Sequence, residues 1–119
     1  MFYIGSITLS ESKLGGKGIF ATKAIKKGEC IEKGIMTRLT NVDGNENPHL
    51  FTWSEDRKLW CCGSGLLPFY NHSENPNIRK VADLINDTMQ IYAILDINKG
   101  DEICGSYYSK KWRKCFQSF

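Results

Sequence analysis

The chain has 119 residues, 41% hydrophobic and 24% charged, which is the composition of one globular domain with its own core, spanning residues 1–119. Its net charge of +3 is too small to argue for nucleic-acid binding by itself. No run of about 20 apolar residues occurs, so we expect no transmembrane helix. Residues 1–13 lack the basic start and apolar run of a signal peptide, which predicts an intracellular protein.

Short strand-like segments follow one another along the chain, separated by turns rich in Gly, Asn and Asp. Asn86-Asp87 predicts a hairpin turn between two of these segments. In the tail, Trp112 and Phe116 are spaced to share one face of a short helix. The pattern predicts a mainly β domain with strands over residues 2–9, 30–36, 49–53, 59–62, 78–84, 89–95 and 102–104.

Three glycines, Gly15, Gly16 and Gly18, lie within four positions near the N-terminus. They indicate either a simple hairpin turn or a backbone that must approach another group closely. A dinucleotide-binding loop is excluded, because no helical pattern follows the glycines.

The most unusual stretch covers residues 64–77, where an apolar run over residues 66–70 ends abruptly in Asn71-His72-Ser73 and then Asn75-Pro76-Asn77. Asn, Ser and Pro favour turns, because their side chains bond the nearby backbone or fix its φ angle. The stretch is either a loop that satisfies its own polar groups or the centre of a functional site.

The five cysteines are irregularly spaced and include no Cys-x-x-Cys pair, so we expect free thiols and no metal site. They are Cys30, Cys61, Cys62, Cys104 and Cys115. The densest basic cluster lies in the tail, and it is either a solvated helix face or a contact for phosphate or an acidic partner. Its members are Lys110, Lys111, Arg113 and Lys114.

Four stretches, in order, resemble the SET domain of protein lysine methyltransferases. They are Gly-Lys-Gly-Ile-Phe-Ala at 16–21, Ile-Lys-Lys-Gly-Glu-Cys-Ile-Glu at 25–32, Phe-Tyr-Asn-His-Ser-x-x-Pro-Asn at 69–77, and Ile-x-Lys-Gly-Asp-Glu-Ile followed by Ser106-Tyr107 at 97–107. The last two are specific when they occur together. The resemblance spans residues 14–108, and the length and the Tyr107 to Trp112 spacing are similar to the minimal, stand-alone viral SET proteins.

The resemblance implies small curled β-sheets of the β-clip type, a C-terminal pseudo-knot that brings the Asn-His-Ser stretch beside the terminal tyrosine, and a short terminal helix. It also implies a homodimer. Two departures are visible. First, Glu74 stands where many members have a zinc-binding Cys, and the tail holds only Cys115, so we expect no structural zinc. Secondly, Gly105 stands two places before Tyr107, where many members have an aromatic residue, and Ser106 stands where Asp is usual. Because Gly105 leaves room around the acceptor amine, we expect di- and trimethylated products; the alternative is that Gly105 only relieves a crowded strand.

The activity implied by the resemblance is transfer of a methyl group from S-adenosylmethionine to a lysine, in the first place on a histone H3 tail in the nucleus. The tail cluster would then contact the nucleosome. The acceptor amine must be neutral, but at pH 7 only roughly one free lysine side chain in 2,500 is uncharged. The enzyme therefore needs an apolar channel that disfavours the ammonium form. The alternatives are an inactive peptide-binding module and a methyltransferase of a non-histone protein.

The resemblance also assigns roles to individual residues. The catalytic residue is Tyr107, whose hydroxyl would orient the methyl group and the amine. Tyr70, Tyr108 and Gly105 are assigned to the lysine channel. The alternative for Tyr70 and Tyr108 is a packing role. A structural role for His72 is preferred over general-base action. The implied cofactor-binding set is Gly16, Lys17, Gly18, Asn71, His72, Trp112 and Phe116.

Overall fold

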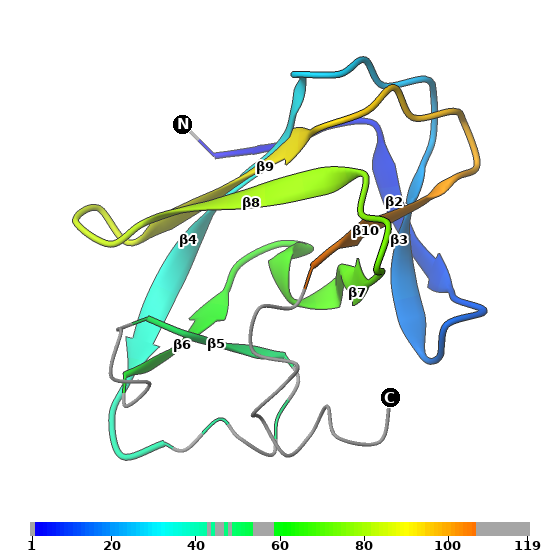
Figure 1. Cartoon of the computed structure of the whole chain (residues 1–119). Coiled ribbons are helices and arrows are strands. Elements are labelled where there is room, and N and C mark those ends of the chain that lie inside the picture. The colour runs from blue at the N-terminus through cyan, green and yellow to red at the C-terminus, as the bar shows by residue number, and fades with distance from the viewer. Residues whose placement is uncertain (1, 43, 45–46, 48, 54–58, 107–119) are drawn as a thin grey trace.

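The computed structural model describes residues 2–42, 44, 47, 49–53 and 59–106 (Figure 1). In these residues the fold is mainly β, as predicted. The first half contains β1 (Tyr3–Ile4), β2 (Ile7–Glu11), β3 (Lys17–Ala21), β4 (Cys30–Leu39) and β5 (Leu50–Thr52). The second half contains β6 (Trp60–Gly63), the 3-10 helix η2 (Leu67–Phe69), β7 (Asn71–His72), β8 (Ile78–Asp83), β9 (Thr88–Ala93) and β10 (Glu102–Gly105).

Two sheets organise the described strands. The larger has the order β5-β6-β4-β9-β8, with β1 also paired to β4, and the smaller has the order β2-β3-β10-β7. In Figure 1 the long, curved β4 and the β8–β9 hairpin lie on one side, while β10 lies beside β3 and β7 on the other. The smaller sheet therefore joins the N-terminal hairpin to segments from the second half of the chain.

The core lies where the apolar faces of both sheets meet. On β9 the alternation is regular, with Met89, Ile91 and Ala93 buried and the residues between them partly exposed. Such alternation is expected for a strand with one face on the core. Ile103 of β10 and Ile19 of β3 are both fully buried and belong to the same cluster, so one core holds the two sheets together.

The prediction of a single strand over residues 2–9 is wrong. Two strands occur there, because Ser6 has a left-handed φ of 63° that breaks the extended run. β1 pairs with β4 and β2 pairs with β3, so the break sends the two halves into different sheets. The hairpin-turn interpretation of the glycine cluster is confirmed, since Gly15 and Gly16 have φ of 117° and 61° in the turn between β2 and β3.

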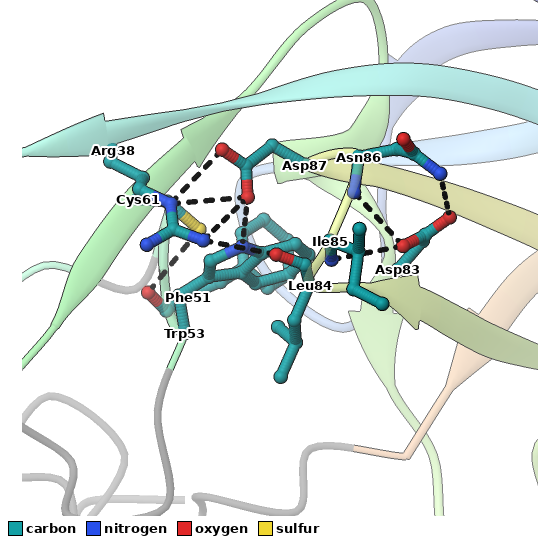
Figure 2. A network of polar contacts seen from close by, with 9 residues as sticks. All are labelled: Arg38, Phe51, Trp53, Cys61, Asp83, Leu84, Ile85, Asn86 and Asp87. Atoms are coloured by element: carbon teal, nitrogen blue, oxygen red, sulfur yellow. Dashed lines mark hydrogen bonds and ion pairs between the residues drawn. The ribbon is translucent and has the colours of Figure 1, made fainter.

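The predicted hairpin at Asn86-Asp87 is confirmed as the β8–β9 turn (Figure 2). Asp87, at φ 52°, accepts hydrogen bonds from the Arg38 guanidinium at 2.9 Å and from the Trp53 indole at 2.9 Å. These two donors hold the pKa of the Asp87 carboxyl below its ordinary value. Arg38 also donates to the Leu84 carbonyl at 3.0 Å, so the hairpin is tied to β4 by a side chain as well as by its strands.

The pseudo-knot threading and the short terminal helix fall on residues 107–119, outside the described residues. Within the part of the chain that the structure describes, no helix is long and apolar enough to cross a membrane.

One carboxylate lies inside this core. Glu32 of β4 is 1% exposed, accepts the Tyr70 hydroxyl at 2.7 Å and accepts the Leu66 backbone N–H at 2.9 Å. Burial raises the pKa of Glu32, although the hydrogen bonds from Tyr70 and Leu66 partly oppose that shift. A Cβ on Gly65, which has φ 58°, would come within 2.6 Å of a Glu32 oxygen, so the backbone wraps closely around this acid.

We predict that Glu32→Gln changes how stability depends on pH. Because the folded-state pKa lies above the unfolded value, Glu32 contributes stability that is complete below its unfolded-state pKa and is lost as pH rises through the folded-state pKa. The amide cannot ionise, so urea unfolding followed by circular dichroism should show the variant gaining on the wild type between acid and neutral pH. Parallel stability profiles would contradict the prediction.

Tyr70→Phe is the matched variant for the same buried pair. It removes only the hydroxyl that donates to Glu32. Leaving that buried oxygen without its donor should cost about 1–3 kcal/mol of unfolding free energy at neutral pH.

Candidate active site

The Asn-His-Ser stretch is brought to the C-terminal strand by a parallel pairing. Strand β7 lies beside β10 with Asn71 opposite Cys104 and His72 opposite Gly105. The pairing continues past the strand, because the Ser73 N–H donates to the Gly105 carbonyl at 2.9 Å. Two segments about thirty residues apart in sequence therefore share one surface.

Asn77 fixes this pairing with its side chain. Its Oδ1 accepts the Cys104 N–H at 2.9 Å, and its Nδ2 donates to the Glu102 carbonyl at 3.0 Å. Its own backbone N–H donates to the Cys104 carbonyl at 3.0 Å. The side-chain amide thus satisfies β10 as a neighbouring strand would, and the Asn-Pro-Asn turn is the sequence signal for this role.

The Asn71 amide is the centre of a polar cluster that we call the Asn71–Glu102 cluster, made of Ser12, Lys17, Gly18, Asn71 and Glu102. The Asn71 Nδ2 donates to Glu102 Oε2 at 2.8 Å and to the Lys17 carbonyl at 3.1 Å. The Ser12 hydroxyl donates to the other Glu102 oxygen at 2.7 Å. The cluster joins the N-terminal glycine turn, β7 and β10 at one place.

Gly18 shows why a glycine is needed here. A Cβ at this position would overlap the Glu102 carboxylate and would lie 2.9 Å from the Asn71 Nδ2. The close-approach interpretation of the glycine cluster therefore applies to Gly18, whereas Gly16 and Gly15 serve the turn. The Lys17 side chain does not bond to Asn71 or Glu102 but forms an ion pair with Glu11.

Sequence reasoning missed Glu102 and Ser12 as members of the cluster. Glu102 carries a weak signal, because it starts a strand directly after a turn and the residue that follows it, Ile103, is apolar. Ser12 carries none, since a serine in a glycine-rich turn is ordinary. Cys104, two residues after Glu102, is buried, and this burial raises the pKa of its thiol to about 12. That thiol is therefore protonated at neutral pH.

His72 lies next to the cluster but contacts a different group. Its Nε2 is 2.9 Å from the Glu74 carboxylate, and its side chain is mostly covered while that of Glu74 is exposed. Glu74 stands at the position where the resemblance implies a zinc-binding Cys in many proteins, and here it contacts the histidine ring.

Two residues assigned to the lysine channel are described. Tyr70 is 1% exposed and donates to Glu32, which is the arrangement expected of its packing alternative. Gly105 lies at the end of β10, and a Cβ there would come within 3.2 Å of Lys80 Cε and 3.6 Å of Ile78 Cδ1. Lys80, which sequence reasoning did not single out, therefore lies beside Gly105, the position that the resemblance assigns to the lysine channel.

The other predicted site residues, Tyr107, Tyr108, Trp112 and Phe116, lie outside the described residues. Among the residues that the structure does describe, no group of three or more His, Cys, Asp or Glu side chains is arranged to hold a metal ion. The described cysteines, Cys30, Cys61, Cys62 and Cys104, are free thiols.

Comparison with known proteins matches residues 16–108 to the family model of the SET domain. A curated relative is 24% identical over 113 residues, covering 89% of this chain and 76% of its own length. It is the histone-lysine N-methyltransferase of Schizosaccharomyces pombe that is specific for lysine 37 of histone H3.

Solved structures give the same fold. A Plasmodium falciparum protein, provisionally named a histone methyltransferase, superposes with a TM-score of 0.68 at 32% identity, over 86% of this chain and 92% of that one. A structure of Polycomb Repressive Complex 2 from Chaetomium thermophilum superposes with a TM-score of 0.73 at 24% identity. The match covers 90% of this chain but only 15% of that one, so the likeness there is to the domain fold alone. By its match over most of its length, the chain belongs to the SET-domain family, as an enzyme of the lysine methyltransferase class.

Proposed function

We propose that this chain transfers methyl groups from S-adenosylmethionine to a lysine of the histone H3 tail, and that it adds more than one methyl group. The observation that carries the proposal is the Asn71–Glu102 cluster, in which the motif residues of both halves of the chain meet beside Gly18. Support for histone H3 comes from the curated relative, which acts on that histone.

The residues of the cluster fit the amino-acid end of S-adenosylmethionine. That end carries an ammonium and a carboxylate, and the cluster offers the Glu102 carboxylate and the Lys17 carbonyl as acceptors for an ammonium. The glycines leave the backbone uncovered on the turn side, because a Cβ at Gly16 would meet nothing within 4 Å. We propose that Gly16, Lys17 and Gly18 hold the cofactor together with Asn71 and His72. Trp112 or Phe116 would cover its adenine ring.

The chemistry needs a donor, an aligned acceptor and a neutral amine. When bound, S-adenosylmethionine supplies an electrophilic methyl group. The chain's own task is positioning, since alignment of two reactants can account for most of an acceleration of this kind. We assign the orienting hydroxyl to Tyr107 and the channel walls to Tyr108 and Gly105, and we assign Tyr70 to packing against Glu32.

Partners and location are proposed on the same footing. The histone tail would bind in the nucleus, and the basic cluster at Lys110, Lys111, Arg113 and Lys114 would contact the nucleosome.

We propose that residues 1–119 form one SET domain and that it pairs as a homodimer, as the resemblance to stand-alone viral SET proteins implies. Light scattering at micromolar concentration should report twice the 13.6 kDa chain mass, and a 13.6 kDa particle would refute the dimer.

The first prediction of this proposal is activity on a peptide. Purified protein with S-adenosylmethionine and no added metal should methylate a histone H3 peptide, and mass spectrometry over time should show di- and trimethylated products. Tyr107→Phe removes one hydroxyl, so turnover should fall by about 10²-fold or more, on the scale of a lost transition-state donor.

Each outcome of that assay has a distinct meaning. A protein that methylates other proteins but no histone would refute the histone H3 target, and one that transfers to nothing would favour a peptide-binding module. Loss of activity on chelation would contradict the zinc-free interpretation. A product that stops at one methyl under excess cofactor would refute multiple methylation while leaving transfer intact.

A second prediction concerns cofactor affinity. Asn71→Ala removes the amide that donates to Glu102 and to the Lys17 carbonyl, so the cluster loses its central link. Calorimetry should show weaker binding of S-adenosylhomocysteine, by roughly tenfold for a hydrogen-bonding group next to a charged ligand. Asn86→Ala, in the distant β8–β9 turn, is the matched control and should bind as the wild type does. Equal affinities in the two variants would refute the placement of the cofactor.

A further inference from the structure

Lys80 occupies an unusual position for a lysine, on the inner face of strand β8. It lies directly opposite Ile91, which is fully buried, and residues directly opposite each other in an antiparallel pair share a face of the sheet. Its neighbour Arg79 lies on the other face, with its guanidinium carbon 5.3 Å from the centre of the Tyr92 ring. Arg79 and Lys80 therefore lie on opposite faces of the sheet, with Lys80 on the inner face.

The inward side chain spans the space beside Gly105. Lys80 Cε is the atom nearest to the place that a Cβ on Gly105 would take, at 3.2 Å. Further along, the Lys80 ammonium lies 5.4 Å from the centre of the Phe51 ring, within the range of a cation–π interaction. The stem is thus anchored at both ends, by strand β8 and by the ring on β5.

We infer that the Lys80 stem forms the wall of the acceptor-lysine site at the place that Gly105 leaves without a side chain, and so determines how many methyl groups are added. The inference rests on the proposed function, which assigns Gly105 to the lysine channel. It goes further by naming the residue that fills the space, because Gly105 itself contributes no side-chain volume there.

Volume rather than charge is the property that acts. The carbon Cε faces Gly105, while the charge is held against the Phe51 ring. An amine that already carries methyl groups needs more room to rotate into line with the donor. In a tight apolar site, one methylene more or less changes rates by roughly 10–200-fold.

The test compares three variants in a methylation time course followed by mass spectrometry. Lys80→Ala should raise the ratio of the third to the first methylation rate constant by at least about tenfold, since it removes several methylenes from the wall. Lys80→Met keeps a long apolar side chain without the charge and should give the wild-type ratio. Arg79→Ala, which removes the outward cation from the next position, should also leave the ratio unchanged.

A binding measurement gives a readout that does not depend on turnover. Fluorescence anisotropy with labelled H3 peptides, one unmodified and one trimethylated at the acceptor lysine, should show that Lys80→Ala improves the relative affinity for the trimethylated peptide. If Lys80→Ala does not fold, as judged by circular dichroism, Lys80→Val shortens the same stem with a residue suited to a strand. The product ratio should then shift in the same direction.

Two results would overturn the inference alone, and a third would overturn the proposed function together with it. A shortened stem that behaves as Arg79→Ala does, in an active enzyme, would show that Lys80 is not the wall. A Lys80→Met variant that shifts as far as Lys80→Ala would show that charge is the property that matters. A wild type that neither methylates nor binds either peptide would overturn the proposed function, and the inference with it.

Discussion

The parallel pairing of β7 with β10 is the constraint on which the rest of the site depends. Two short strands from distant parts of the chain would gain little from their few backbone hydrogen bonds alone, because closing the loop between them costs conformational entropy. The Asn77 side chain adds two hydrogen bonds to β10, at 2.9 and 3.0 Å, and so locks the register. Once that register is set, Asn71 lies opposite Cys104 with its side chain bonded to Glu102, and His72 lies opposite Gly105, so the motif residues meet.

The buried hydrogen bond between Tyr70 and Glu32 helps to position β7 for its pairing with β10. Tyr70 directly precedes β7, so its hydrogen bond to Glu32 fixes where the chain enters the site. Glu32 also accepts the Leu66 N–H at the start of the turn that leads into η2. One acid on β4 therefore holds both ends of the apolar run whose sudden stop is so visible in the sequence. Burying a carboxyl group is costly unless it is well hydrogen-bonded, and these donors offset part of that cost.

Sequence alone predicted those features whose causes are local. The strand expected over residues 89–95 and the Asn86-Asp87 turn depend on neighbouring residues, and the structure has both, the strand as β9. The break at Ser6 was missed, because nothing in a strand-like run announces a left-handed residue. Glu102 and Lys80 were missed for another reason: each acquires its role from the register of a strand against a partner far away in sequence. Tyr70 could be packing or channel on sequence alone, and only its burial against Glu32 favours packing.

We propose that the Asn71–Glu102 cluster holds the methyl donor, and a titration followed by nuclear magnetic resonance is the decisive experiment. ¹⁵N-labelled protein would be titrated with S-adenosylhomocysteine while the backbone amide signals are recorded. If the cluster holds the donor, the amide signals of residues 16–18, 71–73 and 102–105 will shift together with one dissociation constant, while those of the β8–β9 turn at residues 84–87 will not move. Shifts centred on that turn, or on any surface away from the cluster, would contradict it.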